Sequence, residues 1–255
     1  MRQTPPSAAW NSPRPIAGAR PATAPVASLR HFIGFLLIGV GVAAMGFLAQ
    51  HAPARPGIEA GQLASHGQAL GVYLTAIGMD WALLYYCWAG VHRQGGTMAT
   101  LSGGRWRSAR DLLNDLAVAL PFWLVWQGAA AGLAQWVGPN AAKAFDTLLP
   151  RSPLEVLVWA AASVTAGVCE ELGFRGYVQR QLRAFTGSTA LAVAGQAAVF
   201  GIFHLYQGWK NVLVIALLGV LFGAFAAWRG NLRVNILSHA MTDFWEGWLK
   251  FVVWR

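Results

Sequence analysis

Two adjacent carboxylates and an arginine stand at the end of an apolar run of this chain. Glu170 and Glu171 follow residues 154–169 directly, and Arg175 comes one helical turn after Glu171. An Asp or Arg side chain at the centre of a membrane helix costs roughly 2.5–3.5 kcal/mol on insertion scales. A chain that keeps such groups at membrane depth is therefore expected to use them.

The two glutamates are predicted to have different roles, because successive residues of a helix point about 100° apart. Glu171 and Arg175 have the i, i+4 spacing with the acid first, which favours an ion pair, and the planar guanidinium can hold a carboxylate by two hydrogen bonds. Glu170 is then left without a neutralising partner, which suits a general base. The alternative is an interfacial ion pair that only caps the helix.

Two histidines lie in later apolar runs. His204 follows Phe200 by one helical turn, and His239 precedes Asp243 by one turn, with Glu246 on the same stripe. A histidine and a carboxylate at this spacing can bind a metal together, or one can orient the other. Each pattern alone also suits ordinary helix packing. Together, on three successive apolar segments, they predict a site that activates water inside a membrane.

The composition predicts a polytopic membrane protein. The chain has 255 residues, of which 56% are hydrophobic and 11% charged, whereas soluble domains average about 25% charged residues. We expect an all-α bundle of about seven transmembrane helices. Residues 1–30, rich in Pro, Ala and Arg, are expected to form a disordered basic tail, and residues 31–255 the bundle. The expected spans are 32–50, 70–91, 113–137, 154–172, 190–206, 212–228 and 234–253, the fourth continuing toward Arg183.

The formal charge of +9 does not indicate nucleic-acid binding, because the basic residues are spread through the short loops and form no single face. With a cytoplasmic N-terminus, 13 of the 19 Lys and Arg residues fall on the cytoplasmic side and 6 outside. The sequence thus predicts an integral membrane protein with the N-terminus in the cytoplasm and the C-terminus outside. The Ala-, Arg- and Trp-rich composition suggests a bacterial inner membrane.

The ordered set Glu170-Glu171-x3-Arg175, Phe200-x3-His204 and His239-x3-Asp243 resembles the three signatures of the CPBP family. This family, also called the Abi or CAAX-protease group, contains intramembrane proteases related to the type II prenyl-protein endopeptidase. The resemblance covers residues 152–250. It implies an endopeptidase that hydrolyses a peptide bond of a membrane-associated protein or peptide in contact with lipid, and it leaves open whether that substrate is lipidated.

The resemblance also implies roles for individual residues. Glu170 and His204 would position and activate the attacking water, and His239 with Asp243 would stabilise the oxyanion. The prenyl-protein endopeptidases usually carry Asn where this chain has Asp243. An ionised Asp cannot donate to an oxyanion, so Asp243 must carry a proton, orient His239 or serve a metal.

Other functions stay open at this stage. The same chemistry could depend on zinc, with Glu170, His204 and His239 as ligands and an open fourth position, so the sequence leaves the cofactor as either none or Zn. A non-catalytic immunity or scaffold protein of the same fold is a further alternative. An intramembrane proton relay would predict internal repeats, and none is visible. Asp80, in the second span, is predicted to face the bundle interior and to pair with a Tyr, Lys or Arg rather than to take part in the chemistry.

The predicted depths of the three groups do not agree. At ~1.5 Å of rise per residue, Glu170 lies ~20 Å, His204 ~24 Å and His239 only ~12 Å from the cytoplasmic ends of their helices. Helix tilt, side-chain reach or a deep re-entry before the last helix must bring them together.

Overall fold

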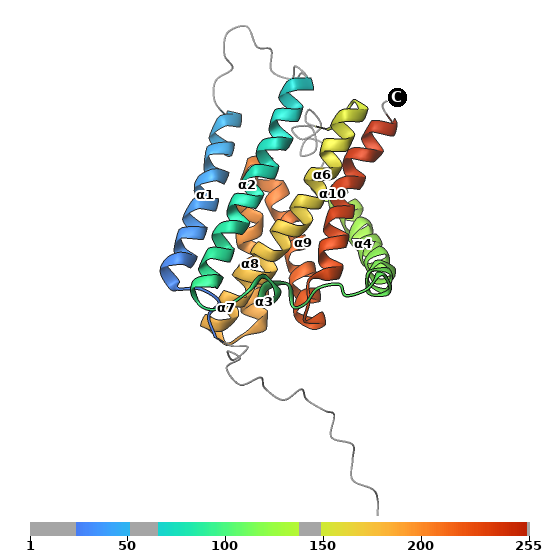
Figure 1. Ribbon diagram of the computed structural model, residues 1–255. Helices are drawn as coiled ribbons and strands as arrows, with labels where there is room; N and C mark the ends of the chain where they lie inside the picture. Colours follow the sequence, from blue (N-terminus) through green and yellow to red (C-terminus); the bar gives the residue numbers. More distant parts are fainter. Residues whose placement is uncertain (1–23, 52–65, 138–148, 254–255) are drawn as a thin grey trace, which may run out of the picture.

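A computed structural model of the protein describes residues 24–51, 66–137 and 149–253, which are helical apart from short turns (Figure 1). This confirms the all-α bundle. In chain order the elements are α1 (Leu29–His51), α2 (His66–Arg93), α3 (Met98–Ser102), α4 (Ala109–Val137), α6 (Pro153–Glu170), the π-helix η1 (Glu171–Val178), α7 (Gln179–Thr186), α8 (Thr189–Phe203), the 3₁₀ turn η2 (Leu205–Gln207), α9 (Trp209–Arg229) and α10 (Arg233–Val253).

Each of the seven predicted apolar runs overlaps these helices, and the run 190–206 continues past α8 into η2. Within the described residues, five segments are long and apolar enough by themselves to cross a membrane. The other two are α8 and α10, the helices that bring in the histidines. Helix α8 has 15 residues and ends just before His204. Helix α10 has 21 residues, but Asn235, His239, Asp243 and Glu246 lower its hydropathy. Helix α8 is therefore apolar but short, whereas the polar groups of the site weaken the signal of α10.

The fourth predicted span continues past the glutamates, as expected. It runs without a break from Pro153 to Thr186 through α6, η1 and α7. A capping box starts it, in which Ser152 and Glu155 each accept a hydrogen bond from the backbone N–H of the other. Gly187 ends it with φ of +67°, a left-handed conformation that glycine adopts readily.

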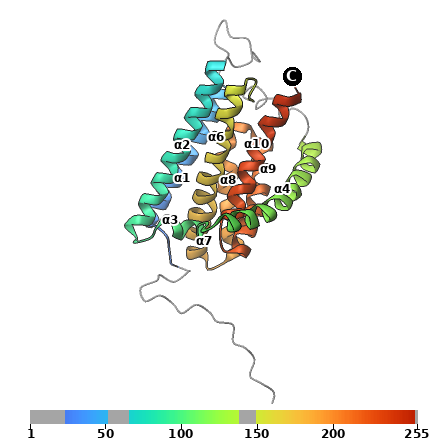
Figure 2. The ribbon, with the colours of Figure 1, turned by 45° about the vertical axis from the view of Figure 1, so that its right-hand side comes forward.

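Close backbone contacts hold the later helices together. A Cβ at Gly167 of α6 would lie 2.8 Å from the carbonyl oxygen of Ile236 in α10, and a Cβ at Gly219 of α9 would lie 2.9 Å from the Cα of Ala197 in α8. Glycine is therefore needed at both positions for the helices to approach. In Figures 1 and 2, α1 and α2 lie on one side of the bundle and α4 on the other, with α6 and α10 between them.

A buried carboxylate ties α4 to the α9–α10 connection. Asp115, which is 1% exposed, forms ion pairs with Arg229 at 2.7 Å and Arg233 at 2.8 Å. The indole N–H of Trp106 donates to the same carboxylate at 2.9 Å. This cluster fixes the start of α10, and it was not singled out from the sequence.

The end of the predicted basic tail belongs to the folded part. Ala27 is buried, and its backbone N–H and C=O pair with the side-chain amide of Gln181 at 3.0 and 2.9 Å. The ordered chain therefore begins before α1. Residues 1–23 of the tail lie outside the described residues.

The two ends of the helical bundle bear the start of the first helix and the end of the last helix, as a chain with its termini on opposite sides of the membrane would have. Helix α1 begins at one end of the bundle and α10 ends at the opposite end (Figure 1). We therefore expect single cysteines placed near the two termini to react with a membrane-impermeant reagent from opposite sides, the N-terminal one from the cytoplasm. The native Cys87 and Cys169 are buried, which keeps the background low. Labelling of both termini from one side of the membrane would contradict the predicted topology.

Candidate active site

Glu171 is the centre of a buried polar cluster. Arg175 donates from Nη1 to Glu171 Oε1 at 2.8 Å, and both side chains are fully buried. The structure thus contains the ion pair that the i, i+4 spacing predicted. The same Oε1 accepts a second hydrogen bond from His239 Nδ1 at 2.8 Å, and Oε2 accepts one from Asn235 Nδ2 at 3.3 Å. Glu171 therefore joins the π-helix to α10.

The guanidinium of Arg175 is held between aromatic rings. It lies 4.3 Å from the ring centroid of Phe200 in α8 and 5.5 Å from that of Phe222 in α9. Its Nε and Nη2 atoms have no hydrogen-bond partner among the described residues. Cation–π attraction, which strengthens away from water, compensates part of this loss. Arg175 thus connects three helices around the glutamate.

Glu170 lies outside the ion pair of its neighbour, as the sequence predicted. Its Oε2 atom is buried without a hydrogen-bond partner in the described part of the chain. Two imidazole nitrogens lie nearest to this oxygen, His239 Nε2 at 3.6 Å and His204 Nε2 at 3.9 Å. The side chain keeps 18% of its surface exposed, so water can reach a carboxylate that has no permanent partner.

The tautomers of the two histidines follow from their other ring nitrogens. His204 Nδ1 lies 2.8 Å from the carbonyl oxygen of Phe200. A carbonyl oxygen only accepts, so Nδ1 must carry the proton. The same argument gives a proton to His239 Nδ1, which faces the carboxylate of Glu171. Each ring therefore turns Nε2 toward Glu170.

Asp243 lies beside His239 on the outer side of the site. Its Oδ2 is 3.8 Å from His239 Nε2, and its side chain is 33% exposed. Its backbone carbonyl accepts a 2.8 Å hydrogen bond from the indole N–H of Trp159 in α6. Since Glu171 already orients His239 through Nδ1, Asp243 is free to face a substrate.

The π-helix helps to resolve the disagreement over depth. Glu170 is the last residue before η1, in which the hydrogen bonds run from residue i to i+5, as from Gln179 N–H to Phe174 C=O. A wider turn advances less per residue than an α-helix, so eight π-helical residues bring Glu170 closer to the helix end than the sequence estimate. The sequence estimate assumed a uniform α-helical rise, which this segment does not have.

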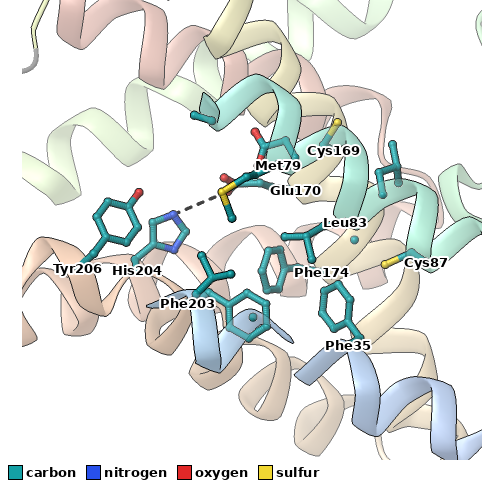
Figure 3. A pocket seen from close by; sticks show the side chains of 16 residues that line it. Phe35, Met79, Leu83, Cys87, Cys169, Glu170, Phe174, Phe203, His204 and Tyr206 are labelled. Carbon is teal, nitrogen blue, oxygen red and sulfur yellow. Dashed lines mark ion pairs between the residues drawn. The ribbon is translucent and has the colours of Figure 1, made fainter. Parts of the chain in front are cut away.

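A cavity of about 200 Å³ opens beside Glu170 and His204 (Figure 3). In Figure 3, Glu170 and His204 approach each other at one end of the cavity, and Phe35, Leu83 and Phe174 line the rest. Asp80 and Tyr206 also line it. The predicted pair of Asp80 with a Tyr, Lys or Arg is not found in the described part of the chain. The site is thus a small apolar chamber with its ionisable groups at one side.

The zinc alternative gains no support from the donor groups. Among the described residues, no three His, Cys, Asp or Glu side chains are grouped so that they could hold a metal ion. This includes Glu170, His204 and His239, the expected ligands. We therefore derive the chemistry below from the protein side chains alone.

Sequence reasoning missed the second bond of Glu171 and the role of Asn235. Asn235 is fully buried, and its Nδ2 also donates to the carbonyl of Phe222 at 2.9 Å. It stands one helical turn before His239 on the face of α10 that carries Asp243. That spacing was visible in the sequence and would have extended the polar stripe by one residue.

The fold and this cluster define a polytopic α-helical membrane protein with a Glu–His site buried between its later helices. Residues 152–245 match the sequence model of the family described as "Type II CAAX prenyl endopeptidase Rce1-like", which is a protease family. The match confirms the predicted resemblance to the CPBP membrane proteases. It runs from the cap of α6 into α10 and leaves out α1, α2 and α4. Neither the curated proteins nor the solved structures contain a match.

Proposed function

We propose that this protein is an intramembrane endopeptidase that hydrolyses a peptide bond of a membrane-associated protein or peptide. The observation that carries the proposal is the buried Oε2 of Glu170, which has no hydrogen-bond partner in the described ranges and is flanked by the Nε2 atoms of His239 at 3.6 Å and His204 at 3.9 Å. A water molecule between the carboxylate and His204 would lie within hydrogen-bonding reach of both.

Glu170 is the general base of this reaction. It takes a proton from the water while the water oxygen attacks the carbonyl carbon of the peptide bond. His204 Nε2, which accepts because Nδ1 donates to Phe200, holds the second hydrogen of that water. The carbonyl oxygen becomes an oxyanion, and the tetrahedral intermediate then breaks its C–N bond as the amine is protonated.

His239 is placed to stabilise the oxyanion. Its Nδ1 is engaged by Glu171, so Nε2 is the nitrogen that faces the reacting atoms. When the ring is protonated, Nε2–H donates to the oxyanion, and Glu171 balances the charge of the imidazolium. A single donor of this kind contributes about 10²–10³ in rate. Asp243, carrying a proton, would supply a second donor beside it.

The surroundings fit a substrate held at the membrane. The chamber next to Glu170 is lined mainly by apolar side chains, so an apolar segment of a peptide, or a lipid attached to it, would be favoured over a polar one. We propose that the protein works in a bacterial inner membrane with its N-terminus in the cytoplasm.

Purified protein in lipid vesicles tests this function directly. It should cleave members of a library of apolar peptides, with the products identified by mass spectrometry, while metal analysis of the same sample finds far less than one zinc per chain. A library left intact would instead favour the non-catalytic scaffold. Activity that requires one bound zinc per chain would favour the metal-dependent reaction.

Asp243→Asn separates the roles of Asp243. If Asp243 donates to the oxyanion, it must carry a proton, and rising pH removes that proton and the activity with it. Asparagine donates at every pH, so we expect the variant to keep or exceed wild-type kcat/KM and to show a flatter alkaline limb in its pH profile. Asp243→Ala, the control without a donor, should be slower. An Asp243→Asn variant that is inactive until zinc is added would contradict the oxyanion role.

A further inference from the structure

We propose that Asp80 is a second catalytic carboxylate, the general acid that protonates the amine leaving the scissile peptide bond. This inference rests on the proposed function. Asp80 belongs to α2, which lies outside the segment that matches the protease family, and it carries no part of the family signatures. The structure nevertheless brings it to the wall of the cavity that holds Glu170 and His204.

The ionisable residues that line this cavity with Asp80 are Cys87, Cys169, Glu170, His204 and Tyr206. Glu170 of α6 and both His239 and Asp243 of α10 act on it electrostatically. Cys169 and Tyr206 border the same cavity, and both are close enough to Asp80 for its charge to act on them. The lining from α1 is apolar: Phe35, Gly39 and Val42. Among the described residues, no Lys or Arg lines this cavity.

A charge count favours at least one proton on a carboxylate of the site. Four carboxylates face it: Asp80, Glu170, Glu171 and Asp243. Three groups can be cationic: Arg175, His204 and His239. Even with both histidines protonated, four negative charges would face three positive ones in an apolar surrounding, where an unpaired charge is costly.

Asp80 fits a resting proton in addition to the one that the oxyanion role gives to Asp243. Glu171 is paired with Arg175 at 2.8 Å, and Glu170 lies 3.6 Å from His239 Nε2. Asp80 has no ion pair among the described residues. Two neighbouring carboxylates whose surroundings differ in this way are suited to act as acid and base.

With Asp80 as the acid, the protein itself supplies and recovers every proton that the reaction needs. Glu170 takes one proton from the water, the C–N bond breaks, and the carboxyl proton of Asp80 passes to the amine nitrogen. After the products leave, the proton on Glu170 returns to Asp80 through water in the cavity. One water is consumed, one carboxyl and one amine product form, and both carboxylates regain their first states.

The leaving group provides the test. A peptide that the wild type cleaves is compared with its depsipeptide, in which an ester replaces the scissile amide. The leaving oxygen of an ester departs with less help from an acid than the leaving nitrogen of an amide does. We expect Asp80→Asn to lose roughly 10²–10⁴ in kcat/KM on the amide but less than about tenfold on the ester. Asp80→Glu should restore part of the amide activity. Thr75→Ala, an exposed change on the same helix, should leave both rates unchanged.

Equal losses on amide and ester would mean that Asp80 supports the fold only, and would overturn the proposal. An infrared measurement needs no substrate and so separates this proposal from the proposed function. Wild-type protein at neutral pH should show the C=O stretching band of a protonated carboxyl, and Asp80→Asn should reduce it. An unchanged band would overturn the acid role even if the protein proves to be a peptidase.

Discussion

Replacing Glu171 or Arg175 by alanine is expected to destabilise the folded protein by about 3–5 kcal/mol, because each change leaves one buried charge without its partner. The structure makes the expected loss larger for this pair than for an exposed one. Both side chains are fully buried, the same carboxylate also binds His239 and Asn235, and Arg175 packs on Phe200. Activity should fall as well, since His239 loses its orientation.

Thermal unfolding in detergent measures this effect. Arg183→Ala is the matched control, because Arg183 is an exposed arginine of α7 only two turns farther along the chain. It should melt like the wild type, while Glu171→Ala and Arg175→Ala melt at clearly lower temperatures. The double variant should lose less than the sum of the two single losses, as coupled partners do. Wild-type melting of both single variants would show that the pair is solvated and incidental.

The elements of this fold were largely readable from the sequence. The seven apolar runs all overlap helices, and the 34-residue helix from Pro153 to Thr186 extends past the glutamates as expected. The partner of Glu171 was also predictable, since Arg175 is four residues away on the same helix and local spacing decides such a pair. That Glu170 lies outside the Glu171–Arg175 pair followed from the same spacing, whereas the two histidines beside it did not.

Contacts between helices were not readable in the same way. The bond between Glu171 and His239 joins residues 68 positions apart, and no local periodicity predicts it. The π-helix changes the rise and the facing of the residues after Glu170, so distances estimated from an ideal α-helix do not apply to this segment. Asp80 was expected to have a cationic or phenolic partner, whereas the packing of α2 against the site leaves it facing other carboxylates.

Glu170→Gln is expected to keep the fold and to remove most of the activity. Glutamine has nearly the same shape and places a polar group in the cavity, so no void and no unpaired charge arise. An amide cannot accept the proton of the attacking water, and general-base catalysis contributes roughly 10²–10⁴ in rate. Asp111→Asn is the control, because Asp111 lies near the start of α4, outside the residues that line the site, and its replacement keeps an acceptor for the Arg107 N–H.

The rate of peptide cleavage by wild type and Glu170→Gln, reconstituted side by side in vesicles after equal melting temperatures have been verified, tests the central claim most directly. The account predicts a loss of at least about 10²-fold in kcat/KM for Glu170→Gln, with Asp111→Asn unchanged. Near wild-type turnover by a folded Glu170→Gln protein would contradict it, because the carboxylate between the two histidines would then not be the base.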